Sequence, residues 1–208
     1  MKITWLGHSC FLIENNSGET LLTDPFDTSV GYGEPDADAD VITVSHHHHD
    51  HDNVEAIGRS KAVYDKAGDY SFGSFKIEQI PSFHDDVKGA KRGPNLITVI
   101  EADGEKIVHL GDLGHFLDTE QLHSISAADV LLVPIGGYYT IDSKTAADIV
   151  QTAKPKSVVA MHYRNERCEF PISDEKEFVK LTDAVYVNNC TEYVNFLPKS
   201  CVLRYKNQ

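Results

Sequence analysis

The sequence predicts an α/β protein in which two β-sheets pack face to face and helices cover their outer sides. Three observations support this: strand patterns dominate the N-terminal half, strands alternate with helices after it, and 208 residues fit one domain. No low-complexity linker and no block of like charges divides the chain. We therefore expect a single domain that covers residues 1–208.

The N-terminal half is predicted to be rich in strands. Polar and apolar residues alternate in the first strand, Met1–Leu6, and Asn15–Gly18 has the composition of a hairpin turn. A short helix is expected at residues 52–60, because Asp52 and Glu55 have the spacing of a capping box. Further strands are expected at Cys10–Glu14, Thr20–Thr23, Val41–Val44, Val63–Tyr64, Asp69–Phe72, Ser74–Ile80, Leu96–Ala102 and Lys106–Leu110.

The C-terminal half is predicted to alternate strands and helices. Helices are expected at Thr119–Ala127, Ser143–Thr152 and Asp174–Leu181. Strands are expected at Val130–Val133, Ser157–Met161, Ala184–Val187 and Thr191–Phe196. Sheets that pack against each other with the helices outside are the natural way to bury these apolar faces.

Charge and composition exclude several classes of protein. The chain has 19 basic and 32 acidic side chains, whereas binding of polyanions depends on lysine and arginine, so no extended nucleic-acid surface is expected. No apolar run approaches the roughly 20 residues that span a bilayer, and the N-terminus lacks the pattern of a signal peptide. Four widely spaced cysteines suit reduced thiols, so we expect a cytoplasmic protein without membrane contact.

A histidine-rich segment follows the strand predicted at Val41–Val44. Residues two apart share one side of an extended chain, so His46 and His48 can reach one metal ion. Asp50 and His51 are adjacent and can reach a second ion close by. The spacer residues are His47 and His49, which we expect to take no direct part.

Three further donors occur where an apolar strand ends. Catalytic zinc sites usually have three protein ligands and one open position, so four donors cannot complete two sites. His84, Asp112 and His162 each follow a predicted strand, and loops at strand ends are where a rigid sheet presents reactive groups. The combination predicts a site for two divalent metal ions, with zinc favoured and manganese or iron also compatible.

With these motifs the sequence resembles the metallo-β-lactamase superfamily over nearly its whole length. The start and the segment Val133–Asp142 are similar to its small bacterial metal-dependent hydrolases, a branch that includes proteins like ascorbate-6-phosphate lactonase. The resemblance implies a four-layer αβ/βα sandwich with the metals at one edge of both sheets. The motifs that carry it are "WLGHSCFLI", "TDPF", "VSHHHHDH", "SFHDD", "HLGDLGH", "VPIGGYYTID" and "AMHY".

The resemblance also implies how the donors are shared. It assigns His46, His48 and His84 to the first metal, Asp50, His51 and His162 to the second, and Asp112 to both. Asp24 would support the ligand loop without binding metal, because carboxylates next to metal-bound histidines fix the orientation of their rings. The bridging position holds Asp112 and not a cysteine, so we do not expect β-lactamase activity.

The expected reaction is hydrolysis of a small anionic molecule: a lactone, ester, amide or phosphodiester. Two metal ions can bridge a water, lower its pKa toward about 7 and provide hydroxide as the nucleophile. Asp112 could accept its proton, and His115 is a candidate proton donor to the leaving group.

Alternatives remain at the sequence level. A phosphodiesterase or nuclease, a di-iron oxidoreductase and a regulatory metal-binding protein could share these ligands, and a homo-oligomer is possible. Lys91 and Arg92 could contact an anionic substrate. Three side chains could either border the site or serve the structure: His8, Tyr138 and Tyr139. The basic loop Lys88–Gly93 is expected to be solvated, and His109 and His123 are expected to be structural or surface residues.

Overall fold

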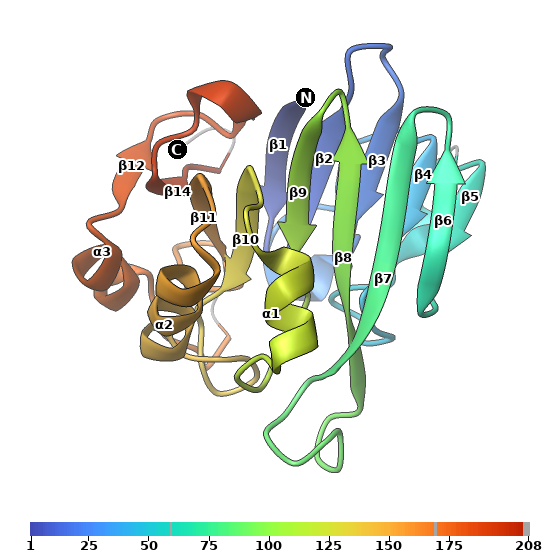
Figure 1. Ribbon diagram of the computed structural model, residues 1–208. Helices are drawn as coiled ribbons and strands as arrows, with labels where there is room; N and C mark the ends of the chain where they lie inside the picture. The colour runs from blue at the N-terminus through green and yellow to red at the C-terminus, as the bar shows by residue number, and fades with distance from the viewer. Residues whose placement is uncertain (59, 169, 206–208) are drawn as a thin grey trace.

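The computed structural model describes residues 1–58, 60–168 and 170–205, and it contains two β-sheets that pack face to face (Figure 1). The first sheet has six strands in the order β13 (Thr191–Tyr193), β1 (Lys2–Gly7), β2 (Cys10–Glu14), β3 (Thr20–Thr23), β4 (Val41–Thr43) and β5 (Ala62–Tyr64). The second has eight, in the order β12 (Val185–Val187), β14 (Ser200–Leu203), β11 (Ser157–Met161), β10 (Val130–Pro134), β9 (Glu105–His109), β8 (Pro94–Ala102), β7 (Phe75–Phe83) and β6 (Gly68–Phe72).

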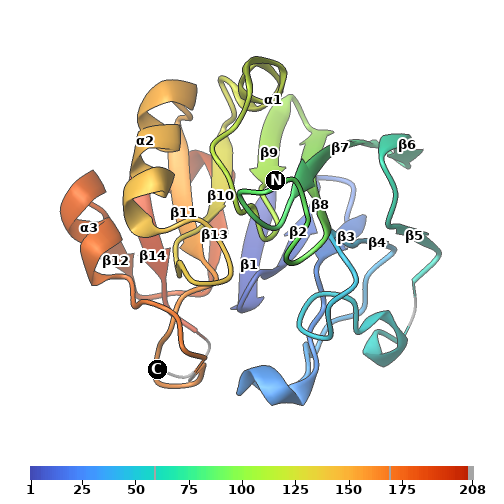
Figure 2. The ribbon, with the colours of Figure 1, turned by 90° about the horizontal axis from the view of Figure 1, so that it is seen from below.

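Helices α1 (Thr119–Ile125), α2 (Ser143–Ala153) and α3 (Lys176–Thr182) cover the outer side of the eight-stranded sheet (Figures 1 and 2). The connections that lead into β4 and β5 contain the 3-10 turns η1 (Thr28–Val30) and η2 (Val54–Ala56). Within the described ranges, no helix has the length and apolar character needed to cross a bilayer. The mixed α/β fold with two packed sheets is the one that the sequence predicts.

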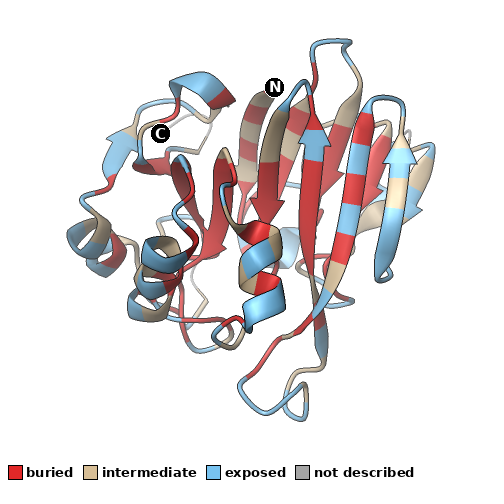
Figure 3. Cartoon of the chain, in the orientation of Figure 1, coloured by how far each residue is buried: buried red, intermediate tan, exposed pale blue. Residues whose placement is uncertain are grey.

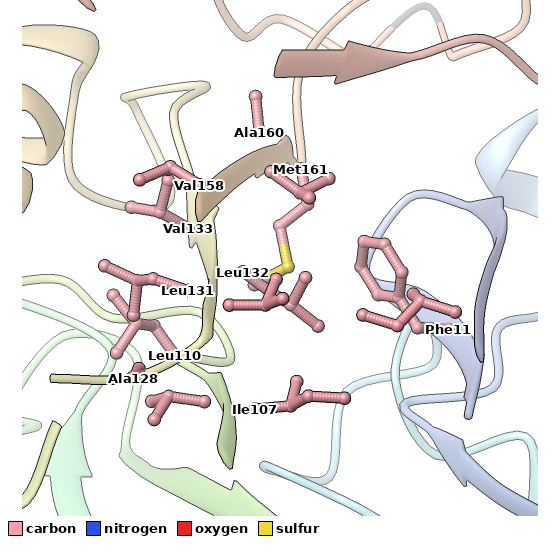
Figure 4. Close-up of a cluster of buried hydrophobic side chains, with 14 of the residues drawn as sticks. Phe11, Ile107, Leu110, Ala128, Leu131, Leu132, Val133, Val158, Ala160 and Met161 are labelled. Atoms are coloured by element: carbon pink, nitrogen blue, oxygen red, sulfur yellow. The ribbon is translucent and has the colours of Figure 1, made fainter. Parts of the chain in front are cut away.

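The main core fills the space between the sheets, and burial follows from which sides of a strand are covered (Figure 3). Strands β10 and β11 are buried at every position, because the helices pack on one face and the other sheet on the opposite face. Buried and exposed residues alternate through most of β7, which lies away from the helices. Figure 4 shows Leu132 of β10, Met161 of β11 and Phe11 of β2 in one buried cluster between the sheets.

Two predicted elements differ from the structure, and one observed strand was not predicted. The expected helix at residues 52–60 is only the turn η2, because Asp52 pairs with His47 at 3.3 Å and does not cap a helix; residue 59 lies outside the described ranges. The expected strand Thr191–Phe196 ends early, and Val194–Phe196 forms the 3-10 turn η3. Strand β14 was not predicted, since its four residues depend on pairing with the distant strands β11 and β12.

The strand directions bring several loops to one end of the molecule. Strand β4 runs parallel to β3, and β9, β10 and β11 run parallel to one another. Their carboxyl ends, and that of β7, lie at the lower end in Figure 1, the side from which Figure 2 is seen. The residues that follow these strands therefore meet there, although they come from distant parts of the sequence.

Candidate metal centre

All seven predicted metal donors lie in the loops at this end of the sheets. The first four follow β4, and the others follow β7, β9 and β11 one by one. The potential ligand atoms in each of three groups lie within 4.8 Å of one another. These groups are His46, His48 and His84; His46, His51 and Asp112; and His8, Asp50, His51 and His162.

The buried carboxylate of Asp112 lies at the centre of the cluster. Its Oδ2 atom is 3.1 Å from Nε2 of His162, 3.2 Å from Nε2 of His84 and 4.0 Å from Nε2 of His46. Its Oδ1 atom is 3.3 Å from Nε2 of His51. Two ligand atoms that each lie about 2.1 Å from one tetrahedral ion are about 3.4 Å apart, so these spacings suit shared metal ligands.

Several buried polar atoms around Asp112 have no hydrogen-bond partner in the described part of the chain. They include Nε2 of His46, His51 and His162 and Oδ1 of Asp112 itself. Buried polar atoms are normally hydrogen-bonded, and unpaired imidazole nitrogens beside carboxylate oxygens are the donor set that divalent cations such as zinc bind. The residues present therefore fit one or more divalent metal ions.

The charges of the cluster also favour a bound cation. Burial alone would raise the pKa of Asp112, but the nearby His162 and His51 hold it well below its usual range. Burial alone would lower the pKa of His51, but the carboxylates of Asp112 and Asp50 raise it well above its usual range. The charges of the cluster thus favour a cation next to Asp112, a position for which a proton and a metal ion would compete.

Asp24 fixes two of the histidines through a short hydrogen-bond network. Its carboxylate accepts the backbone N–H of Ser45 at 2.7 Å, the Ser45 hydroxyl at 2.6 Å and Nδ1–H of His51 at 2.9 Å. Because the Ser45 proton is used for Asp24, Ser45 Oγ accepts from Nδ1 of His46, 2.9 Å away. Both rings therefore keep a proton on Nδ1, which leaves Nε2, on the side of Asp112, as the nitrogen that can bind a metal ion in place of a proton.

Asn95 supports the turn that carries Asp112, and the sequence analysis did not identify it. Its Oδ1 accepts the backbone N–H of Asp112 at 2.9 Å, and its Nδ2 donates to Ser82 Oγ and to the Leu110 carbonyl. Gly111 has a φ of +56°, and a Cβ there would lie 2.4 Å from Asn95 Oδ1. The turn before Asp112 consequently requires glycine. The sequence signal for the supporting role of Asn95 is weak, because it consists of an asparagine near the start of an apolar strand.

His8 borders the cluster. Its Nε2 lies 3.2 Å from Asp50 Oδ2, and its ring centroid lies 4.1 Å from that of His162. The side chain is buried, and burial together with His162 lowers its pKa to about 4. His8 is thus placed to hold Asp50 in position as a neutral hydrogen-bond donor.

The remaining histidines lie in different surroundings. His47 and His49 are exposed and face Asp52 and Asp27, at 3.3 and 3.6 Å. His109 is buried and bonds the Ser9 carbonyl at 2.8 Å, whereas the exposed His123 lies on α1.

His115 bonds the backbone through both ring nitrogens. Nδ1–H donates to the Phe116 carbonyl at 2.8 Å, and Nε2 accepts the backbone N–H of Phe83 at 3.2 Å. In this arrangement the ring connects its own loop to the end of β7, and both nitrogens already have a backbone partner. A role for His115 as a proton donor remains a prediction.

Two packed sheets with a histidine and aspartate cluster at the ends of their strands are the arrangement that the sequence resemblance implies. Residues 2–162 match the family described as the beta-lactamase superfamily domain, and the chain belongs to the metallo-β-lactamase superfamily. The family resemblance and the fold class that the sequence predicts are therefore confirmed.

Individual relatives place the chain more narrowly within this superfamily. It is 36% identical over 200 residues to a UPF0173 metal-dependent hydrolase from Carboxydothermus hydrogenoformans, covering 78% of this chain and 84% of the relative. It is 35% identical over 210 residues to a relative of the same name from Thermococcus onnurineus, covering 87% and 92%. A solved Thermotoga maritima structure, assigned as a Zn-dependent hydrolase of the metallo-beta-lactamase superfamily, is 36% identical with a TM-score of 0.81 over 99% of both chains. The chain is a metal-dependent hydrolase of this superfamily.

Proposed function

We propose that the protein is a binuclear metal-dependent hydrolase that acts on a small anionic molecule. The observation that carries the proposal is the buried Asp112 carboxylate, whose oxygens lie 3.1–4.0 Å from Nε2 of four histidines. One ion would not use all of these donors, because catalytic zinc usually keeps about three protein ligands and an open position.

The grouping of the side chains supports two neighbouring ions, with Asp112 shared. Without thiolate ligands, this set suits zinc best, and manganese or iron is also compatible. The first ion would be held by His46, His48 and His84, and the second by Asp50, His51 and His162. When bound, such a pair lowers the pKa of a water molecule toward about 7 and polarises the oxygen of the bond under attack.

The protein's own residues prepare this chemistry. Asp24 holds His51 directly and His46 through Ser45, and His8 holds Asp50. Asp112 is positioned to accept a proton from the attacking water. Two aspartates offset only about half the charge of two divalent ions, so the centre would attract an anion within an otherwise acidic protein of net charge −13.

The chemistry fits a lactone, ester, amide or phosphodiester of a small molecule. A nuclease would need basic surface to follow a polyanion, and the chain has only 19 lysine and arginine residues against 32 acidic ones. A cytoplasmic setting belongs to the same proposal, because it would keep the free cysteines reduced.

The test combines metal analysis with substrate turnover. Tag-free protein should contain about two metal ions per chain and hydrolyse one class within a panel of lactones, esters and phosphodiesters. An oxygen-uptake assay distinguishes a di-iron oxidoreductase, which would consume oxygen without hydrolysing the panel.

Variants then test the ligands. Asp112→Ala should lose most of the metal and activity, and His48→Ala should lose one of two ions, with the sheets still folded by circular dichroism. His47→Ala is the matched control, because this adjacent histidine is exposed and should retain wild-type metal content. Full metal occupancy in Asp112→Ala would contradict the proposal.

A further inference from the structure

The loop that follows His84 is tied to the metal centre at both of its ends. Asp85 accepts the backbone N–H groups of four residues of this loop, including Lys91 and Arg92, both at 2.8 Å. The backbone N–H of His84 donates to the Gly93 carbonyl at 3.1 Å. The positions of Lys91 and Arg92 are therefore fixed relative to the metal ligand His84.

The side chains of these two cations have different surroundings. Lys91 is exposed, and its Nζ pairs with Asp86 Oδ1 at 2.9 Å. Arg92 is half-buried and forms no ion pair with a carboxylate in the described ranges. Its guanidinium carbon lies 5.8 Å from the ring centroid of Tyr138 and 5.6 Å from that of Tyr139. Contacts of this length are attractive and hold the guanidinium in one place without neutralising its charge.

The tyrosine pair connects Arg92 to the side of the cluster near His8. The Tyr139 ring centroid is 6.3 Å from that of Phe170, which is 5.8 Å from the ring of His8. On the other side, Arg92 lines a cavity of about 360 Å³ together with His46, His48, Asp65, Lys66 and Leu96. A cation with no carboxylate partner thus borders the same space as two proposed metal ligands.

We propose that Arg92 binds an anionic group of the substrate, a carboxylate or a phosphate, while the bond to be cleaved lies at the metal centre. This inference rests on the proposed hydrolase function and names its substrate class: a small molecule that carries an anionic group beside a hydrolysable bond. The planar guanidinium can form two parallel hydrogen bonds to either anion. Because Tyr138 and Tyr139 already hold it, little freedom would be lost on binding.

The kinetic test uses pairs of substrates that differ only by a carboxylate. Suitable pairs are 4-nitrophenyl propanoate with mono-4-nitrophenyl succinate, and γ-butyrolactone with 5-oxotetrahydrofuran-2-carboxylate. Arg92→Ala should lower kcat/KM for the charged member by about 10- to 100-fold, mainly through KM, and leave the neutral member within about threefold. Arg92→Lys should retain part of the preference, and Lys91→Ala is the matched control with wild-type values.

An equilibrium measurement separates this inference from the hydrolase proposal. Titration of metal-loaded protein with succinate at constant ionic strength should show a Kd about tenfold weaker for Arg92→Ala than for wild type and Lys91→Ala. If the wild type hydrolyses neither pair, the hydrolase proposal fails for these bonds, and the titration still decides the role of Arg92. Equal losses on neutral and charged substrates, equal effects of both alanine variants, or an unchanged Kd in Arg92→Ala would each overturn the assignment.

Discussion

Replacing Asp24 should weaken metal binding although Asp24 is not expected to touch a metal ion. Its carboxylate accepts a hydrogen bond from Nδ1–H of His51, with 2.9 Å between Nδ1 and Oδ2, and so keeps the ring proton on Nδ1. It fixes the ring proton of His46 in the same way through Ser45. Removing such a partner typically costs about 10- to 100-fold in metal affinity. That range equals about 1.4–2.7 kcal/mol.

The stability of the fold should also decrease in Asp24→Ala. The substitution leaves two buried donors, the Ser45 backbone N–H and Nδ1–H of His51, without an acceptor. Each unsatisfied donor costs about 1–3 kcal/mol, so the free energy of unfolding should fall by about 2–6 kcal/mol. Asp24→Asn keeps the size and tolerates the left-handed φ of +40°, so it separates the two effects. If the new amide N–H₂ faces His51, the ring proton must move to Nε2, which would block that metal ligand.

The stabilisation of the fold by Asp24 depends on pH through the pKa of its carboxyl group. Burial alone would raise that pKa, but the hydrogen bond from His51 and the nearby His109 lower it below its usual value. A lowered pKa in the folded state means that the carboxylate stabilises the fold above about pH 3.9 and loses this effect as the pH falls further. The difference in unfolding free energy between wild type and Asp24→Ala should therefore shrink in acid.

The measurements are metal affinity by competition with a chromophoric chelator and unfolding in urea. Asp40→Ala is the control, because Asp40 also accepts hydrogen bonds, from Thr20 at 3.0 Å and Lys61 at 2.6 Å, but contacts no histidine. It should lose some stability and keep wild-type metal affinity. Wild-type metal affinity in folded Asp24→Ala and Asp24→Asn would refute the tautomer argument.

Three further predictions concern other parts of the structure. Gly114→Ala should destabilise the fold by about 1–3 kcal/mol and reduce metal content, since a Cβ would lie 2.3 Å from the backbone of the loop after His84; Gly33→Ala, with nothing within 4 Å, is the neutral control. At pH 8 only Cys190 should react quickly with a thiol reagent, because burial raises the pKa of the other three thiols; rapid labelling of more than one thiol would argue against this packing. His115→Ala should lower the melting temperature and retain most turnover, and a large loss of kcat at unchanged stability would instead support proton donation.

Much of the fold was predictable because its signals are local. Hydrophobic runs marked the buried strands β10 and β11, and α1 and α2 were predicted close to their observed positions. The structure adds the residues that cap them, Asp118 and Asp142. The order of the strands in each sheet was not predictable, because it depends on pairings between distant segments such as β1 with β13. Strand β14 was missed for the same reason.

The candidate site was predictable from the position of its donors relative to strands. His84, Asp112 and His162 follow strands that end on the same side, and this rule does not require knowledge of the strand order. The hydrogen bonds that orient the donors could not be predicted in this way. Asn95 holds the Asp112 turn through its side-chain oxygen, and His115 connects its loop to the end of β7. Both contacts depend on loop conformations that sequence spacing does not encode.

The backbone at the site explains why these side chains can converge at all. His8, Asp24 and His162 each follow a strand and have a φ of +50°, +40° and +50°. A left-handed backbone turns the chain sharply at the end of a strand, but it is rarely adopted by residues other than glycine and costs about 1–3 kcal/mol. Glycine would remove this cost, yet it would also remove the imidazole or carboxylate. The three positions therefore trade stability of the fold for polar groups held against Asp50, His51 and Asp112.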